Sequence, residues 1–194
     1  MASGFPMAVL GGRRDLLAYY ADPDPRQRPL LAGTYNGHPV SLTAAIATIE
    51  VLLENDGAVY RHVEQLGGQL ERGAQALLSE LGICATVARQ GSAFSIYFMD
   101  HAPRDWHDLL VHHAFAFDRQ WRAALIGQGV YVFPEATKQC SISAVHTAGD
   151  IEFTLVQMRE TLSALSLTVA LPAVTGADPA DHSAAIQAKA RGKG

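Results

Sequence analysis

The hydrophobic pattern of the chain changes within LGICATVARQGSAFSIYF, residues 81–98. Gly82 ends a helical stripe, and the two segments 83–88 and 93–98 have the short apolar pattern of strands joined by a turn at Gln90-Gly91. The alternating apolar side chains of the second segment are Phe94, Ile96 and Phe98. The stretch therefore predicts an antiparallel hairpin with one buried face.

Two helical segments precede this hairpin. Apolar side chains cover most of the helix surface between Pro39 and Asn55, and no charge occurs before Glu50. This pattern predicts a helix that is buried on several sides. Residues 57–81 have one apolar stripe, which predicts a second, amphipathic helix.

The elements after the hairpin complete an α+β pattern. Asp105 is placed to cap a helix, and segments 130–133 and 140–145 have the composition of two more strands. Thr147 and Asp150 then form a capping-box-like start for a last helix. The order ββαββα predicts an antiparallel sheet covered by helices, which is an α+β fold.

The N-terminal part has shorter elements, and the C-terminal part has none. Residues 7–10 form an apolar run typical of a strand, and a short helix is expected from Arg13 to about Tyr20. Residues 22–29 and 33–39 are rich in turn-forming residues and predict loops. Ala, Gly, Asp and Pro dominate the last segment, 169–194, which predicts a disordered tail.

Composition excludes several classes of protein. The chain has 194 residues, 19 acidic against 15 basic side chains, and 48% hydrophobic residues. One domain, or one domain with pieces of another, is expected for this length. An acidic balance without a basic cluster argues against nucleic-acid binding. No apolar run approaches the roughly 20 residues of a membrane span, and we expect a cytoplasmic protein with no membrane contact.

Residue chemistry alone indicates no catalytic centre. His107, His112 and His113 could suggest a metal site, but adjacent helical residues point about 100° apart, so we predict no metal. No nucleophile elbow, phosphate-binding lysine loop or acidic dyad with a partner histidine is visible. The three lysines are Lys138, Lys189 and Lys193.

Five short motifs resemble one enzyme family. They are GFPMAVLGGRRD (4–15), GTYNGHP (33–39), GSAFSIYF (91–98), GVYVFP (129–134) and SAVHT (143–147). In this order they resemble the second half of class III aminotransferases that depend on pyridoxal 5'-phosphate (PLP), closest to the glutamate-1-semialdehyde 2,1-aminomutase branch. The resemblance covers about residues 2–165 and implies the C-terminal part of a fold-type I PLP-transferase.

The resemblance implies a division of the chain and a function. Residues 1–38 would be a remnant of the large cofactor-binding domain with its interface loop, 39–81 connecting helices, and 82–168 the C-terminal small domain. The complete enzyme would be a homodimeric transaminase or isomerase that transfers an amino group on a small, carboxylate-bearing amino acid or amino-ketone. The family's Schiff-base lysine would precede Met1, so we expect no catalytic residue in this chain and no activity from it alone.

The resemblance also implies site residues. Thr34, beside Gly33, would donate to the cofactor phosphate of the other subunit. Lys138 stands where aminotransferase relatives carry an arginine that binds the substrate carboxylate and where aminomutases tend to have an acid. The structural alternatives are a plain helix-entry loop for Thr34 and an exposed turn lysine for Lys138. The alternative function is a non-catalytic interaction module, or a truncated gene product that pairs with another chain.

Overall fold

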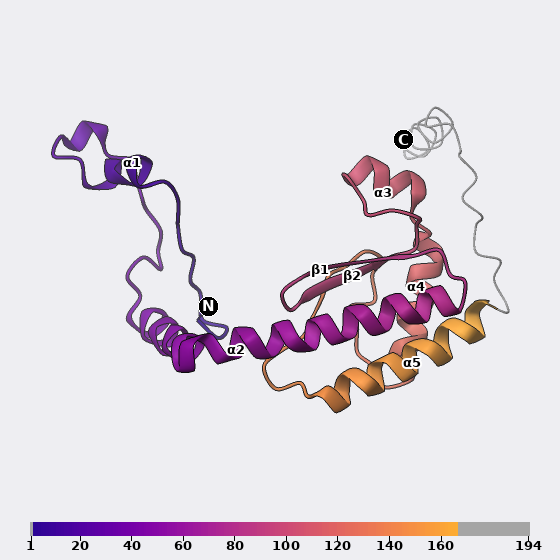
Figure 1. The fold of residues 1–194 in the computed structure, drawn as a ribbon. Coiled ribbons are helices and arrows are strands. Elements are labelled where there is room, and N and C mark those ends of the chain that lie inside the picture. The colour runs from indigo at the N-terminus through magenta and orange to yellow at the C-terminus, as the bar shows by residue number, and fades with distance from the viewer. Residues whose placement is uncertain (1, 167–194) are drawn as a thin grey trace. The chain divides into compact units, whose positions relative to one another are not determined.

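The computed structural model describes residues 2–166, and the chain divides between Val59 and Tyr60 into two compact units (Figure 1). The tail expected at residues 169–194 lies outside the described residues. The α+β class is confirmed, because a three-stranded antiparallel sheet lies among helices in the second unit.

The first unit consists of short helices and loops around one longer helical segment. Its elements are α1 (Arg14–Leu17), the 3-10 helices η1 (Ala18–Ala21) and η2 (Pro25–Gln27), and the beginning of α2 (Pro39–Glu80). The short helix expected up to Tyr20 is therefore present. The prediction of a strand at residues 7–10 is wrong. Within the described residues no strand pairs with this segment, and Val9 and Leu10 are exposed.

Helix α2 is two helices joined by a kink, as the sequence predicts. Backbone angles are non-helical from Glu54 to Gly57, with φ of +49° at Asn55, +57° at Asp56 and +74° at Gly57. The second helix ends at Gly82, where φ is +64° and the Ile83 amide donates to the Leu78 carbonyl at 2.9 Å. This is the glycine-terminated helix end that the sequence indicates.

The second unit has a three-stranded sheet in the order β1-β2-β3. Strands β1 (Thr86–Gln90) and β2 (Ala93–Tyr97) form the expected hairpin, and β3 (Cys140–Ser141) pairs with β2. The predicted strand at 130–133 is absent, and the one at 140–145 is reduced to two residues. The Phe133 carbonyl and the Thr137 amide in this region instead form hydrogen bonds with the side chains of Arg122 and Asp118.

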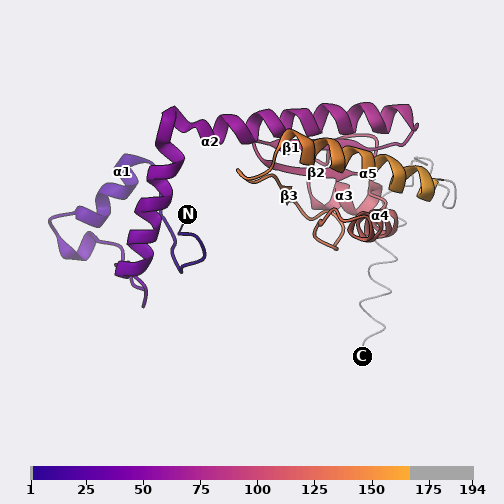
Figure 2. The same cartoon turned by 90° about the horizontal axis from the view of Figure 1, so that it is seen from below.

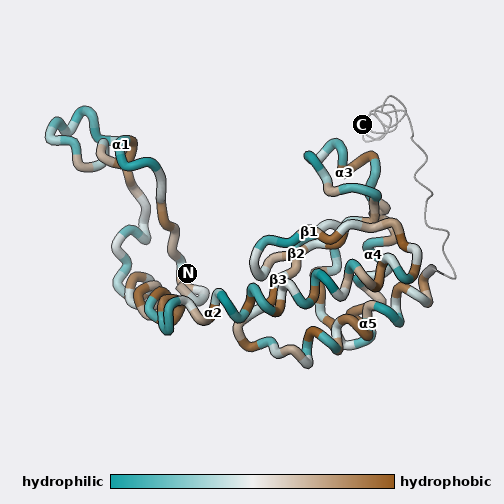
Figure 3. Tube along the Cα trace, viewed as in Figure 1, coloured by the Kyte–Doolittle hydropathy of each residue, from teal (hydrophilic) through white to brown (hydrophobic). Residues whose placement is uncertain are grey.

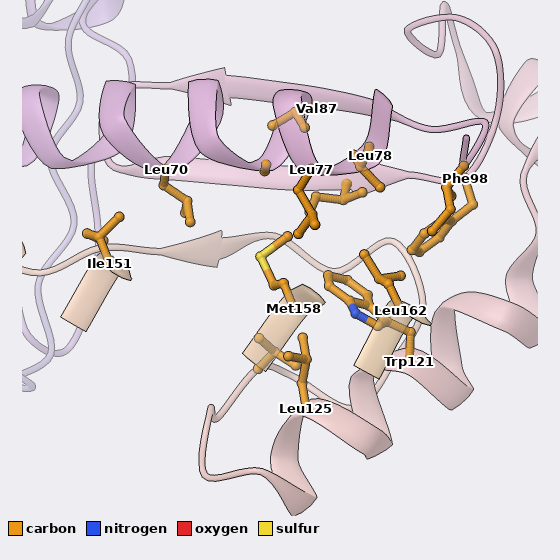
Figure 4. Packing of buried hydrophobic residues seen from close by; sticks show 14 of the residues in the cluster. Leu70, Leu77, Leu78, Val87, Phe98, Trp121, Leu125, Ile151, Met158 and Leu162 are labelled. Atoms are coloured by element: carbon orange, nitrogen blue, oxygen red, sulfur yellow. The ribbon is translucent and has the colours of Figure 1, made fainter. Parts of the chain in front are cut away.

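Three helical segments and the sheet enclose one core. Figures 1 and 2 show the second half of α2 beside α5 (Ala148–Ser166). Gly73 permits this approach, because a Cβ there would clash with the side chain of Leu155. Helix α4 (Phe115–Gly127) packs against α5. Figure 4 shows side chains of these elements meeting in the cluster that includes Leu70, Leu77, Val87, Phe98, Trp121, Leu125, Met158 and Leu162.

The helix expected after Asp105 is interrupted. Asp105 caps α3 (Trp106–His112) as predicted, since its carboxylate accepts from the Asp108 amide. The chain leaves the helix at His113, and the Ala114 amide donates to the Phe98 carbonyl at 3.1 Å before α4 begins. A bond to the end of the hairpin thus replaces the helical bond at this point.

The last helix begins as predicted. Asp150 accepts hydrogen bonds from the amide and hydroxyl of Thr147, each at 2.7 Å, and the Asp150 amide donates to the Thr147 hydroxyl at 3.3 Å. These reciprocal bonds are those of a capping box. None of the described helices is both long and apolar enough to cross a membrane.

Candidate functional site

Gly33 and Thr34 lie in an exposed turn that leads into α2. The Asn36 amide donates to the Gly33 carbonyl at 3.0 Å, and the His38 amide donates to the Tyr35 carbonyl at 3.1 Å. A Cβ at Gly33 would lie 2.9 Å from Asn36 Oδ1, so a larger residue there would require the Asn36 side chain to move. Among the described residues, the Thr34 hydroxyl has no hydrogen-bond partner.

His38 fixes the junction between this turn and the helix. Its Nδ1 accepts from the Ser41 amide at 3.3 Å and lies 3.0 Å from the Ser41 hydroxyl, so the imidazole caps the first turn of α2. Its ring also makes an edge contact with Tyr35, with 5.8 Å between ring centres. His38 therefore anchors the turn to the start of α2, and Thr34 remains exposed to solvent.

The turn borders a pocket of about 620 Å³ in the first unit. Its lining combines the turn with the extended N-terminal segment: Pro6, Met7, Ala8, Leu31, Gly33, Thr34, Tyr35, Asn36, Gly37, His38, Ser41 and Leu42. Both predicted cofactor-binding residues thus line one pocket. The Gly33-Thr34 turn, with an unpartnered hydroxyl and no side chain at Gly33, fits a small anionic group such as a phosphate.

Lys138 lies in the second unit, exposed, after a turn. Its Nζ is 5.8 Å from the centre of the Phe133 ring, a cation-π contact. Its amide donates to the Glu135 carbonyl at 3.4 Å. The preceding residue, Thr137, has a φ of +65°, which a β-branched residue adopts only where the surroundings impose it.

A buried ion cluster imposes that conformation. Asp118 accepts from Arg122 Nε at 2.7 Å and from the Thr137 amide at 2.7 Å. Arg122 Nη1 also donates to the Phe133 carbonyl at 3.1 Å. The two charged residues of α4 thus hold both ends of the turn that precedes Lys138.

His113 completes the cluster. Because its Nδ1 accepts from the Phe98 amide, its Nε2 carries the proton that is donated to Asp118 at 3.1 Å. Burial alone would raise the pKa of Asp118, but the bonds from His113 and Thr137 and the charge of Arg122 together lower it. The carboxylate is therefore charged, and it is buried among three hydrogen-bond donors, His113, Arg122 and the Thr137 amide.

Sequence reasoning missed this cluster, although a signal was present. Asp118 and Arg122 are four residues apart, a spacing that allows an ion pair on one helix, and they occur among the apolar residues of α4. Both side chains are almost completely buried. A charged pair on the apolar side of a helix indicates a partner segment, which here is the turn before Lys138.

The chain has clear relatives among proteins of known function. It is 32% identical over 164 residues to glutamate-1-semialdehyde 2,1-aminomutase from Sorangium cellulosum and 34% identical over 165 residues to the one from Methanothermobacter thermautotrophicus. These matches cover 84% and 85% of this chain. The chain belongs to the aminotransferase-like family that contains these aminomutases. No family model matches the sequence.

Solved structures agree with this family. The chain resembles a glutamate-1-semialdehyde-aminomutase from Pseudomonas aeruginosa PAO1 with a TM-score of 0.59 and 28% identity, over 71% of this chain and 31% of the other. A transaminase with PLP bound has a TM-score of 0.67 over 84% of this chain and 36% of the other; at 23% identity it supports the fold. The chain spans only 36–38% of the length of the two aminomutases from Sorangium and Methanothermobacter.

The residues expected from the family resemblance fall in different units. Gly33 and Thr34 share a pocket in the first unit, whereas Lys138 belongs to the second. The three histidines noted in the sequence do not form one group: the His113 side chain is buried against Asp118, and the His107 side chain is 93% exposed. His112 instead lies beside Asp108.

Proposed function

We propose that these residues form the C-terminal part of a class III, PLP-dependent enzyme that transfers an amino group, as an aminotransferase or a glutamate-1-semialdehyde 2,1-aminomutase does. The observation that carries the proposal is the similarity to aminomutases over 84% of the chain, together with the pocket formed by the Gly33-Thr34 turn. The proposed division is a large-domain remnant at 1–38, connecting helices at 39–81 and a small domain at 82–168. The enzyme would act in the cytoplasm.

Gly33 and Thr34 are proposed to bind the cofactor phosphate. The unpartnered Thr34 hydroxyl can donate to a phosphate oxygen, and a hydrogen bond to a charged group is stronger than one between neutral groups. In the proposed homodimer the phosphate would belong to the cofactor of the other subunit. When bound, PLP supplies the electron sink for chemistry at the amino-bearing carbon.

Lys138 is proposed to bind the carboxylate of a small amino acid or amino-ketone substrate. Its ammonium group is exposed, and the Asp118 and Arg122 cluster fixes the turn that presents it. A lysine attracts a carboxylate as a point charge and lacks the two-pronged geometry of arginine. The residue therefore favours a substrate with a carboxylate, without distinguishing an aminotransferase from an aminomutase.

The 194 residues alone are proposed to be inactive. Residues 1–137 contain no lysine, and the first lysine, Lys138, is assigned to the substrate. A Schiff base with PLP needs a lysine amine positioned at the cofactor. The family resemblance implies that the catalytic lysine precedes Met1, so none of Lys138, Lys189 and Lys193 is proposed for that role.

The exposed apolar side chains of the first unit support the proposal that another polypeptide covers this surface in the complete enzyme. Figure 3 shows the apolar character of the first half of α2, and the exposed side chains there are Val40, Leu42, Ile46, Ile49, Val51 and Leu53. The sequence predicts a helix buried on several sides, and within this chain only Ser41 and Ala45 of residues 39–53 are buried. A dimer partner or a large domain would cover this surface.

The experiment expresses the complete reading frame that contains these residues. We expect an upstream large domain with an in-frame lysine shortly before Gly4; a frame that lacks it contradicts the proposed enzyme. In that polypeptide, Thr34→Ala should weaken PLP retention by about 1–3 kcal/mol. Thr34→Ser keeps the hydroxyl and should retain most of the affinity. Equal retention by Thr34→Ala and the parent in a dialysis titration would make Thr34 a plain loop residue.

A further inference from the structure

Three potential metal ligands converge where the hairpin leads into α3. His101 comes from the loop after β2, and Asp108 and His112 lie one helical turn apart on α3. One imidazole nitrogen from each histidine and one carboxylate oxygen all lie within 4.8 Å of one another. Two elements that are separate in the sequence thus bring two imidazoles and a carboxylate to one point.

The carboxylate of Asp108 occupies the centre of this group. His101 Nε2 lies 3.1 Å from both oxygens of Asp108, and His112 Nδ1 lies 3.0 Å from Oδ1. His112 Nδ1 also donates to the Asp108 backbone carbonyl at 2.9 Å, a bond that a metal ion at this nitrogen would replace. The two imidazole rings are in edge contact, with 5.0 Å between their centres. The group is accessible without being fully exposed, since the side chains of His101, Asp108 and His112 are 30%, 12% and 35% exposed.

Neighbouring groups orient two of the three side chains. Asp100 Oδ1 lies 2.5 Å from His101 Nδ1, which turns Nε2 of the same ring toward Asp108. The Arg104 amide donates to Asp108 Oδ2 at 3.0 Å. A carboxylate on the far nitrogen of a histidine is the usual arrangement around a metal-binding imidazole, where it fixes the ring and increases its basicity.

We propose that His101, Asp108 and His112 bind a divalent transition-metal ion, with Zn²⁺ as the best match. Imidazole nitrogens and a carboxylate oxygen are common zinc ligands, at about 2.0–2.2 Å from the ion. Tetrahedral geometry at these bond lengths puts ligand atoms about 3.4 Å apart, so rotations of the side chains suffice to close the site. Water would take the fourth position.

The bound ion would hold α3 to the hairpin. This helix has seven residues, and Leu109 is its only buried one, so the core anchors it weakly. The ion would join His101 of the loop to both turns of α3. The site is therefore a structural tie, and it does not depend on the proposed enzymatic function.

The test titrates ZnCl₂ into the untagged, EDTA-treated full chain by calorimetry. We expect the parent to bind one equivalent of Zn²⁺. In both His101→Gln and His112→Gln this binding should be lost or weakened at least tenfold. His107→Gln is the matched control, because this histidine lies on the same helix with an exposed side chain and outside the group. It should bind zinc as the parent does.

A second measurement on the parent chain avoids any dependence on how the variants fold. Imidazole resonances of His101 and His112 should shift on zinc addition while those of His107 stay in place, and amide exchange in α3 should slow. Ion pairs between protonated histidines and aspartates would instead give no zinc uptake at micromolar concentration. That result, or uptake with unmoved His101 and His112 resonances, would overturn the proposal.

Discussion

The two halves of helix α2 differ in how far their apolar side chains are buried. In the second unit, Leu66, Leu70 and Leu77 are buried against the sheet and α5. In the first unit, the side chains of Ile46 and Leu53 are 57% and 67% exposed. The second unit thus closes a core with its own residues, while the first exposes its apolar side chains, which we propose are covered by another polypeptide. Stability is expected to depend on the second unit and association on the first.

The largest loss of stability is expected from Asp118→Asn. The substitution leaves the guanidinium of Arg122 buried without its counter-charge and removes the anionic acceptor of His113. Removing one partner of a buried ion pair typically costs about 3–5 kcal/mol. Both tryptophans, Trp106 and Trp121, lie in the second unit, so denaturant unfolding followed by tryptophan fluorescence measures this loss. A loss below 1 kcal/mol would show that the cluster is dispensable.

A deletion in the core separates the two regions directly. Leu162→Ala removes a completely buried side chain that packs among α2, α4 and α5, and it should lower the free energy of unfolding by about 2–5 kcal/mol. Leu53→Ala makes the same chemical change on the exposed part of α2 and should cost no more than about 0.5 kcal/mol. Comparable losses in the two variants would refute the comparison.

The pH dependence of stability should identify the charge on Asp118. Its pKa is lower in the folded protein than the ordinary value of 3.8, so the folded state favours the charged form. The stabilisation is fully present above pH 3.8 and is lost as the pH falls below that value. The stabilities of the parent and of Asp118→Asn should therefore approach each other as the pH falls from 3.8 toward the lower pKa of the folded state. A difference between the two that stays constant down to pH 2 would contradict the assigned charge.

Local signals in the sequence predicted most of the fold. The capping box of Thr147 and Asp150, the stop at Gly82 and the Asp105 cap depend on residues a few positions apart, and all three are present. The misses depend on distant partners. Helix α3 ends because the Ala114 amide donates to the Phe98 carbonyl. Residues 130–133 do not form a strand, and the Phe133 carbonyl accepts a hydrogen bond from Arg122.

The candidate site was predictable to a different degree. Gly33 and Thr34 came from motif resemblance, and they do line a pocket, although their role stays a prediction. The sequence did not predict the group of His101, Asp108 and His112, because the histidines that lie closest together along the chain are His107, His112 and His113. His101 joins the group only through the loop after the hairpin, so three-dimensional proximity was needed to find it.

The smallest effect on stability, and the sharpest on association, is expected from Ile46→Gln with Ile49→Gln. Both side chains are exposed on the first half of α2, so unfolding followed by tryptophan fluorescence should change by no more than about 0.5 kcal/mol. Exposed apolar patches of this kind drive association, and light scattering at tens of micromolar should show larger species for the parent than for the double variant. Val156→Gln, an exposed apolar position on α5, is the control and should associate as the parent does. A monodisperse, monomeric parent would show that the exposed helix needs no partner at this concentration.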